Sequence, residues 1–514
     1  MSPAAVPTIR CGERTREQPL AHERAGRLAA TLTARGIGRG DRVAVMLRND
    51  IEFLEVSLAI AACGANPVPI NTRWQPPEIA HVLADGGVGI VLAHTTFIDT
   101  VERAIELAAV TPLVVEVAMP VELLDEAGLD RAAATPTGRY PTLEEWIDDS
   151  DAPLGHVAGA IADSMGLIYT SGTTGTPKGV LRERMTPQQL LAVAGGTAQR
   201  MGLAPGARML VAGPLYHTSP NAVAVLALRM GADITIMPRW DSLRFLRLVA
   251  ERRITQAKVV PTMLSRLLSV PAEIRSRYDV SSLTHLIHSA APCPPAVKRA
   301  AIDWFGDALI EFYGCTEAGT ITWITATEWL AHPGSVGRGV DGSAAVVATA
   351  DGIPLPPGEI GQVFVRGADY WPAFRYLGRD GESTGPMPGF LTVGDTGYLD
   401  EDGYLYLTGR SSEIIISGGV NIYPAEIESA LLEFDGVEDV AVFGIPHPGD
   451  LGEAVAAHIV PRPGARLDAA ELRDGLRQRL AGYKIPGELR IVTELPRDDS
   501  GKVYKRQLQA LYQP

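Results

Sequence analysis

A short run of hydroxyl, glycine and lysine residues follows the apolar residues Met165 to Ile168, in the order Tyr169-Thr170-Ser171-Gly172-Thr173-Thr174-Gly175-Thr176-Pro177-Lys178-Gly179. Glycines let successive backbone N–H groups turn toward one point, and hydroxyls add donors there. Lys178 puts a cation beside this nest, so we predict an anion site, most naturally for a polyphosphate. In the P-loop of GTPases, Gly-Lys-Ser/Thr opens a helix, whereas Pro177 and Gly179 flank this lysine. The alternative for such a loop in isolation is a surface turn without a ligand.

The segments that must position this loop alternate between helical and strand patterns. We predict helices over residues 21–35, 51–63, 76–84 and 294–305, and strands over residues 42–47, 66–70, 88–93, 207–212, 233–237, 258–261 and 284–289. This alternation is typical of βαβ units and predicts an α/β fold with doubly wound, mainly parallel sheets. The acidic, proline-containing segment 120–156 is expected to be irregular surface.

The pattern changes near residue 339 to short alternating segments. Residues 361–367 and 403–407 are predicted to be antiparallel strands of a small β-barrel-like subdomain. Beyond Arg410, a helix starting at Pro424, strands at 437–443, 454–460 and 489–492, and a helix carrying Leu472, Leu476 and Leu480 predict a separate α+β unit. We therefore expect a large N-terminal domain over residues 1–410 and a small C-terminal domain over residues 411–514.

Composition narrows the class of protein. A chain of 514 residues is too long for one core. A net charge of −14 argues against a nucleic-acid partner. Four cysteines without metal-ligand spacing fit a reducing compartment. No N-terminal leader is visible and the most apolar windows are shorter than a membrane span, so we expect a cytoplasmic protein without integral membrane contact. The oligomeric state is left open, with a homodimer as one option.

Five further motifs follow the loop in order: "SAAPCPP" from Ser289, "EFYGCTEAG" from Glu311, "TVGDTGYLDEDGYLYLTGR" from Thr392, "SGGVNIYPAEIE" from Ser417 and "SGKVYKR" from Ser500. Together with "YTSGTTGTPKGV" they resemble the adenylate-forming superfamily of acyl-CoA synthetases, adenylation domains and luciferases. The resemblance covers nearly the whole chain and is nearest to bacterial fatty-acid or bile-acid-type CoA ligases. It implies ATP, Mg²⁺ and coenzyme A as cofactors and a small-molecule partner that is a carboxylic acid or an acyl adenylate.

The resemblance also implies roles for individual residues around ATP. Thr316 would contact the α-phosphate, Glu317 would hold Mg²⁺, and Asp395 and Arg410 would bind the ribose, with Tyr313 stacking on the adenine. The phosphate loop would contribute Thr170, Ser171, Gly172, Thr173, Thr174, Gly175 and Lys178, and the adenine would be lined by Ala290, Ala291, Pro292, Glu311, Phe312, Tyr313 and Gly314.

Two residues would act on the reacting groups. By the resemblance, Lys502 reaches over the site and bridges the carboxylate and the α-phosphate, which is an electrostatic role. His217 would gate the site between the two half-reactions. A lysine after a glycine is otherwise most often a solvated surface residue, and a lone histidine beside an apolar run is more often structural. Because Tyr216-His217-Thr218 carries no carboxylate to pair with an amino group, a plain carboxylic acid is favoured over an amino acid.

The second half-reaction would be thiol attack after the small domain swings about a hinge. Ser417, Gly418 and Gly419 would line the pantetheine tunnel. The chain departs from the family pattern at the hinge, where Ser411 and Ser412 follow Arg410, and in the acidic "PRDDSGK" around Lys502. The acyl pocket would lie near His217, Thr218, Ser219, Met263, Cys315, Ala318 and Gly319, and its small residues predict a large apolar acid.

Three functions compete. The leading hypothesis is an ATP-dependent acyl-CoA ligase that runs both half-reactions, forming acyl-CoA, AMP and pyrophosphate through an acyl adenylate. The hinge departure motivates a second hypothesis, in which only the thioester step runs on an adenylate made elsewhere. The third is a nucleotide-binding protein that has lost catalysis, and intact Lys178, Glu317 and Lys502 count against it.

Overall fold

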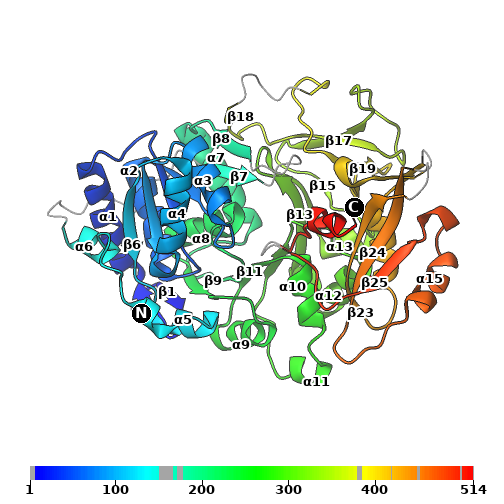
Figure 1. Ribbon diagram of the computed structural model, residues 1–514, viewed down its shortest axis with the longest axis horizontal. Helices are drawn as coiled ribbons and strands as arrows, with labels where there is room; N and C mark the ends of the chain where they lie inside the picture. The colour runs from blue at the N-terminus through cyan, green and yellow to red at the C-terminus, as the bar shows by residue number, and fades with distance from the viewer. Residues whose placement is uncertain are drawn as a thin grey trace. The chain divides into compact units, whose positions relative to one another are not determined.

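The computed structural model describes residues 6–149, 166–170, 178–378, 385–417, 420–447, 452–497 and 501–512 (Figure 1). The chain divides into two compact units. The first comprises residues 1–258, 273–286 and 370–382, and the second comprises residues 259–272, 287–369 and 383–514. Each unit has its own hydrophobic clusters, and one nine-stranded sheet has strands in both units.

The first unit opens with a parallel four-stranded sheet in the order β4-β3-β5-β6. Its strands are β3 (Arg42–Met46), β4 (Asn66–Pro69), β5 (Ile90–His94) and β6 (Leu113–Val117). Helices α1 (Gln18–Ala34), α2 (Ile51–Cys63), α3 (Pro76–Asp85) and α4 (Ile98–Ala108) accompany the sheet. A hydrophobic cluster packs α3 and α4 against one face of this sheet. Val43 and Val45 on β3 point to the opposite face and are also buried. Burial on both faces explains the nearly continuous apolar runs in these strands.

The first unit also holds part of the nine-stranded sheet and a small three-stranded sheet. Strands β1 (Thr8–Cys11), β9 (Arg208–Val211), β10 (Asp233–Ile236) and β11 (Gln256–Val259) are mutually parallel, and β2 (Arg14–Glu17) pairs antiparallel with β1. Along the chain, α7 (Pro187–Arg200) precedes β9, α8 (Thr218–Arg229) connects β9 to β10, and α9 (Ser242–Arg252) connects β10 to β11. Strands β7 (Leu167–Thr170), β8 (Lys178–Arg182) and β18 (Phe374–Tyr376) form a small antiparallel sheet.

The expectation of irregular surface over residues 120–156 is wrong for the described part of that segment. It contains α5 (Val121–Ala127) and α6 (Leu143–Asp148), with Leu123, Leu124, Trp146 and Ile147 buried. Thr142 and Glu145 form a capping box that starts α6. This local signal and the apolar side chains outweigh the acidic, proline-containing composition.

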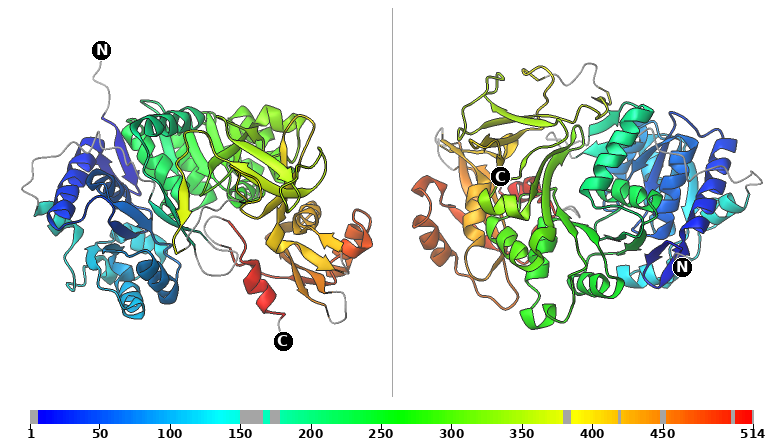
Figure 2. Two further views of the ribbon diagram at one scale, coloured as in Figure 1. Left: turned by 90° about the horizontal axis from the view of Figure 1, so that it is seen from above. Right: turned by 180° about the vertical axis from the view of Figure 1, so that it is seen from behind.

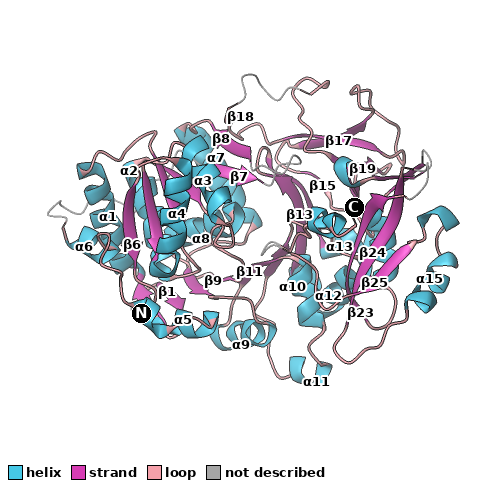
Figure 3. Ribbon diagram, viewed as in Figure 1, coloured by secondary structure: helices cyan, strands magenta, loops and turns pink. Residues whose placement is uncertain are grey.

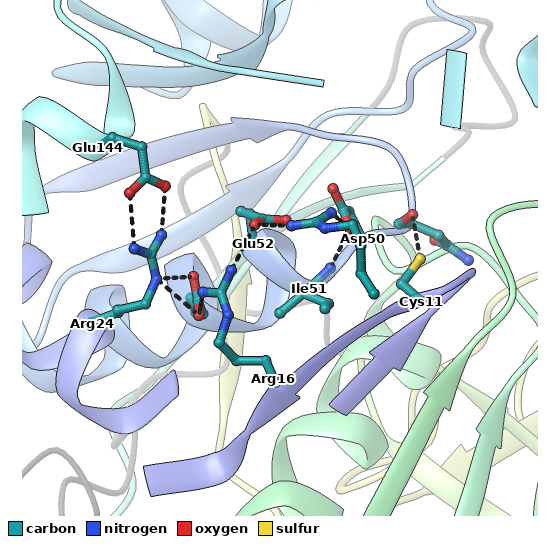
Figure 4. A network of polar contacts seen from close by, with 10 residues as sticks. Cys11, Arg16, Arg24, Asp50, Ile51, Glu52 and Glu144 are labelled. Carbon is teal, nitrogen blue, oxygen red and sulfur yellow. Dashed lines mark hydrogen bonds and ion pairs between the residues drawn. The ribbon is translucent and has the colours of Figure 1, made fainter. Parts of the chain in front are cut away.

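A network of ion pairs fastens the N-terminal strands and α1 to α2 (Figure 4). Asp50, Glu52 and Glu55 in this network are buried, and each meets at least one guanidinium, as a buried charge requires, whereas Glu144 is exposed. The pairs are Arg14–Asp50, Arg14–Glu52, Arg16–Glu55, Arg24–Glu55 and Arg24–Glu144. Removing one member would leave a buried charge without its partner, so this network is a structural clamp.

Buried His94 at the end of β5 makes the stability of the first unit sensitive to acid. Its Nδ1 accepts a hydrogen bond from the Arg48 backbone N–H at 3.1 Å, and burial lowers its pKa to about 3. Because the unfolded chain binds this proton below pH 6.5, stability present above pH 6.5 is lost as the pH falls toward 3. We expect a loss of about 2 kcal/mol at pH 5 from this group.

The measurement is urea unfolding at pH 7.5 and pH 5.0 for the wild type and His94→Asn. Asparagine keeps an acceptor near the position of Nδ1 but does not titrate, so the variant should lose less stability on acidification. Equal losses in the two proteins would show that His94 does not carry this acid sensitivity.

The strands of the second unit, which are among those drawn in magenta in Figure 3, pair mostly antiparallel. Strands β13 (Leu309–Cys315), β14 (Gly319–Thr325) and β15 (Arg338–Gly339) pair in sequence order, and β16 (Ala344–Ala348), β17 (Gly361–Arg366), β19 (Asp395–Leu399) and β20 (Leu405–Arg410) form a four-stranded sheet. Helices α10 (Pro261–Leu268), α12 (Pro295–Phe305) and α13 (Ala326–Ala331) belong to this unit. The short β12 (His285–His288) and α11 (Ala272–Arg275) each straddle a boundary between the units. The nine-stranded sheet has the order β15-β14-β13-β12-β11-β9-β10-β1-β2.

The last hundred residues of the second unit form an α+β arrangement (Figure 2). Strands β23 (Val437–Pro446), β24 (Glu453–Pro461) and β25 (Glu488–Ile491) make one sheet, and β21 (Ile415–Ser417) pairs with β22 (Val420–Ile422). Helices α14 (Pro424–Leu432) and α15 (Ala469–Arg477) share one hydrophobic cluster with the sheet, and α16 (Lys505–Ala510) places Leu508 in another. The predicted α/β fold with mainly parallel sheets and a smaller C-terminal α+β part is confirmed.

None of the helices in the described ranges combines the length and apolar character needed to cross a bilayer.

Candidate active site

The predicted phosphate loop connects two paired strands. Thr170 at the end of β7 lies opposite Lys178 at the start of β8, and Lys178 is half-buried. The predicted site residues Ser171, Gly172, Thr173, Thr174 and Gly175 lie outside the described residues, as does the side chain of Thr170. Tyr169 donates a hydrogen bond to Asp85 Oδ2 at 2.6 Å and so ties β7 to α3. The base of the loop is therefore fixed within the first unit.

The start of α8 carries His217, Thr218 and Ser219, all half-buried. Asn49, which the sequence did not single out, positions the segment before them. Its amide accepts from the Leu215 N–H at 2.7 Å and donates to the carbonyls of Gly213 and Met237 at 3.0 and 2.9 Å. A buried asparagine that forms hydrogen bonds with three backbone groups fixes the backbone that leads to His217.

Lys258, also not predicted as a site residue, lies on β11 and donates a hydrogen bond from Nζ to Ser219 Oγ. Burial lowers its pKa to about 7. A single lysine inside the apolar run Ala257 to Val260 was the available sequence signal.

In the second unit, β13 and β14 hold the predicted Thr316 and Glu317 in the tight turn between them. Gly314 lies so close to Gly319 that a Cβ added to it would approach the Gly319 carbonyl oxygen to 2.2 Å. Only glycine fits there. Glu317 is buried, with 8% of its surface exposed. The predicted pocket residues Met263 and Ala318 are buried too, and Ala318 packs in a hydrophobic cluster with Ile321 and Val347.

A buried ion pair includes Glu311, one of the residues predicted to line the adenine. Lys298 on α12 donates from Nζ to Glu311 Oε2 at 2.6 Å, and these residues are 1% and 5% exposed. Burial raises the pKa of Glu311, and the positive charge of Lys298 lowers it by a smaller amount. His288 Nε2 lies 3.8 Å from the same carboxylate. Ala290, also predicted in this wall, adopts a left-handed backbone with φ of 78°, an unfavourable conformation for alanine.

The predicted ribose-binding residues form one cluster in the second unit. Tyr313 donates a hydrogen bond to Asp395 Oδ2 at 2.6 Å, and Arg410 Nε lies 3.3 Å from Asp395 Oδ1. Burial raises the pKa of Asp395, while Arg410, Tyr313 and Lys502 lower it. A buried carboxylate held by a phenol and a guanidinium is a fixed acceptor for hydroxyl groups.

Lys502 belongs to this same electrostatic neighbourhood, because its charge acts on Asp395. Gly501 before it has a left-handed φ of 84°, and a Cβ there would come within 2.9 Å of Thr262 Oγ1. Arg497 donates to the Gly501 carbonyl and pairs with Asp439 Oδ2 at 2.8 Å. These contacts hold the backbone that carries the lysine.

The predicted hinge residue Ser411 is anchored, since its N–H donates to the Gly394 carbonyl at 2.7 Å and its hydroxyl donates to the same oxygen at 3.1 Å. Ser412, beside it, is exposed. Lys505 bridges Glu413 and Glu428 at 3.0 and 2.9 Å. Ser417 lies on β21, while Gly418 and Gly419 lie outside the described residues.

The described residues contain no group of three or more His, Cys, Asp or Glu side chains arranged to hold a metal. A single carboxylate such as Glu317 fits Mg²⁺ that arrives with a polyphosphate, because Mg²⁺ commonly keeps waters and substrate oxygens as ligands.

Comparison with known proteins identifies the family. The model of the AMP-binding enzyme family matches residues 20–373, and the model of the AMP-binding enzyme C-terminal domain matches residues 426–502.

Among relatives, a feruloyl-CoA synthase of Amycolatopsis sp is 35% identical over 98% of this chain and 95% of its own. A sulfoacetate–CoA ligase of Cupriavidus necator is 34% identical over 94% and 90%. The long-chain-fatty-acid–CoA ligase FadD13 of Mycobacterium tuberculosis is 32% identical over 95% and 91%. The crystal structure of ATP-bound MatB from Rhodopseudomonas palustris is 29% identical, with a TM-score of 0.79 over 100% of this chain and 97% of MatB.

Proposed function

The chain belongs to the family of AMP-binding enzymes and is a ligase that forms carbon–sulfur bonds, and from this premise we propose that it converts a carboxylic acid, ATP and coenzyme A to acyl-CoA, AMP and pyrophosphate through an acyl adenylate. The observation that carries this proposal is the cluster of Tyr313, Asp395 and Arg410 within the electrostatic reach of Lys502.

In the first half-reaction, the acid's carboxylate attacks the α-phosphorus of ATP and pyrophosphate leaves. The carboxylate is already a nucleophile, so the protein needs to hold two anions together and stabilise the charge that develops on phosphorus. Lys502 supplies a positive charge for this step, and Asp395 and Arg410 fix the ribose. Lys178 and Thr316 bind phosphate oxygens. Glu317 would hold Mg²⁺, which supplies charge neutralisation on the polyphosphate.

In the second half-reaction, the thiol of coenzyme A attacks the acyl carbonyl, and AMP leaves. We propose that residues 411–514 act as the mobile domain of the enzyme, with the hinge at Ser411 and Ser412 and with Ser417, Gly418 and Gly419 beside the pantetheine arm. His217 would gate the site between the steps. The four free cysteines support a reducing, cytoplasmic setting.

The acids named for the relatives range from feruloyl and long-chain fatty acyl groups to sulfoacetate. We propose that this enzyme takes an acid with a large apolar body, because Ala318 and Gly319, which the sequence predicts to line the acyl pocket, are small residues. If acetate turned over faster than every bulky acid in a panel, this assignment would be wrong.

Pyrophosphate release from ATP with an acid panel tests the first half-reaction, and thioester formation from a synthetic acyl adenylate tests the second. Both activities together support the proposal. Thioester formation alone would favour an enzyme fed with adenylate by another protein, and neither activity would favour a nucleotide-binding protein without catalysis.

A further inference from the structure

Lys258 lies where a ligand of an α/β sheet is expected to bind. It stands near the carboxyl end of β11, opposite Val211 at the end of the parallel strand β9. The chain leaves β9 through Gly213 to Leu215, which Asn49 holds, and enters α8 at Thr218. Ligands of open α/β sheets bind outside the carboxyl ends of the strands. The Lys258–Ser219 contact is therefore formed at this edge, within the first unit.

The chemistry of this contact is suited to an oxyanion. The ammonium group has three donors, and one is directed to Ser219 Oγ. The Ser219 hydroxyl, which accepts from Lys258, still has a proton to donate. Lys258 and Ser219 are both half-buried, so part of each remains accessible. A partly desolvated ammonium beside a hydroxyl forms strong charge-assisted hydrogen bonds to a carboxylate, sulfonate or phenolate oxygen.

We propose that Lys258, supported by Ser219, recognises a second oxyanion on the acyl substrate, so that the preferred acids carry an anionic group in addition to the carboxylate that is activated. This inference rests on the proposed function, because Lys258 contacts Ser219, which the sequence predicts to line the acyl pocket of that reaction. It makes Lys258 a specificity-determining residue: the apolar body of the acid fills the pocket, and the added anion pairs with the ammonium.

The desolvated state of Lys258 gives this recognition its strength. Burial lowers the pKa of Lys258 to about 7, so near neutral pH the charged form is only partly populated. An oxyanion beside Nζ favours the charged form and raises that pKa again. A hydrocarbon group in the same place would remove water from the ammonium group and offer no hydrogen bonds in exchange for those that the water made. Lys258 thus favours acids that carry a second anionic group and disfavours acids that place a hydrocarbon group beside it.

The experiment compares matched pairs of acids that differ only at the far end: octanoate with suberate, and cinnamate with 4-carboxycinnamate. The value of kcat/KM for pyrophosphate release is measured for the wild type, Lys258→Met, Lys258→Arg and Lys484→Met. Lys484 pairs with Glu426 at the surface and serves as the control for loss of a lysine. Wild type should favour the dianionic member of at least one pair, and Lys258→Met should reduce that preference by about tenfold to a hundredfold.

The remaining outcomes separate this inference from the proposed function. Retention of part of the preference by Lys258→Arg, and of all of it by Lys484→Met, would support recognition by charge. A wild type that uses the plain acids with no preference, or a Lys258→Met enzyme with an unchanged preference, would overturn the role of Lys258 while leaving the ligase function intact. A wild type that releases pyrophosphate with none of the acids would instead count against the proposed function.

Discussion

Replacing Lys502 with alanine is expected to reduce acyl-adenylate formation by about two to three orders of magnitude, the range seen when one preorganised transition-state donor is removed. The charge of Lys502 acts on Asp395, so the lysine lies within electrostatic range of the proposed ribose site. Gly501 and Arg497 hold the backbone before it, and those contacts do not involve the lysine side chain. The substitution should therefore remove a charge and leave the local fold intact.

The two half-reactions should respond differently to this change. Attack of a thiol on a supplied acyl adenylate needs no positive charge between a carboxylate and the α-phosphate, so that step should be spared. Pyrophosphate release and thioester formation from synthetic adenylate are measured side by side, with Lys484→Met as a surface control. Equal damage to both steps would contradict the role of Lys502 in adenylate formation.

The sequence predicted elements best where local signals set both ends. Helix α2 spans the predicted residues 51–63 because Asp50 caps its start and Gly64, in the left-handed region, ends it. Strand β20 begins at Leu405, two residues later than the predicted start, because Gly403 lies in a turn with φ of 80°. The helix predicted through Leu480 ends at Arg477. End positions shift in this way because tertiary contacts, and not periodicity alone, decide the last turn.

Motifs located the cluster of Tyr313, Asp395, Arg410 and Lys502, because those residues lie in recognisable segments. The residues that support the site were missed for a physical reason. Asn49 joins backbone groups more than 160 residues away in the sequence, and Lys258 meets Ser219 across 39 positions. Such contacts depend on how strands are ordered in a sheet, which the local pattern does not specify. An isolated polar residue in an apolar strand was the one signal that Lys258 offered.

Lys298 is another residue that the sequence motifs did not identify. We predict that replacing it has the largest effect on the free energy of unfolding among the substitutions proposed. The Lys298–Glu311 pair is buried, with 1% and 5% of the two residues exposed. Lys298→Met leaves the Glu311 carboxylate buried without its cation, which costs about 3–5 kcal/mol at neutral pH. Because burial already raises the pKa of Glu311, loss of Lys298 raises it further. When the pKa of a carboxyl group is higher in the folded protein than in the unfolded chain, the folded protein is stabilised at low pH and loses that stability as the pH rises through the folded pKa. The loss of stability caused by Lys298→Met should therefore be smaller at pH 5 than at pH 8.

Chemical denaturation, together with hydrogen exchange at the amides of α12 and β13, measures this loss. The double variant Lys298→Met with Glu311→Leu removes both charges and should recover most of the stability, because an apolar pair of similar volume can replace a buried ion pair. Lys484→Met breaks a more exposed pair with Glu426 and should cost about 1 kcal/mol or less. If the double variant were no more stable than Lys298→Met, the loss would come from packing and not from the stranded carboxylate. A pH-independent defect would lead to the same conclusion, because a stranded carboxylate with a raised pKa makes the defect depend on pH.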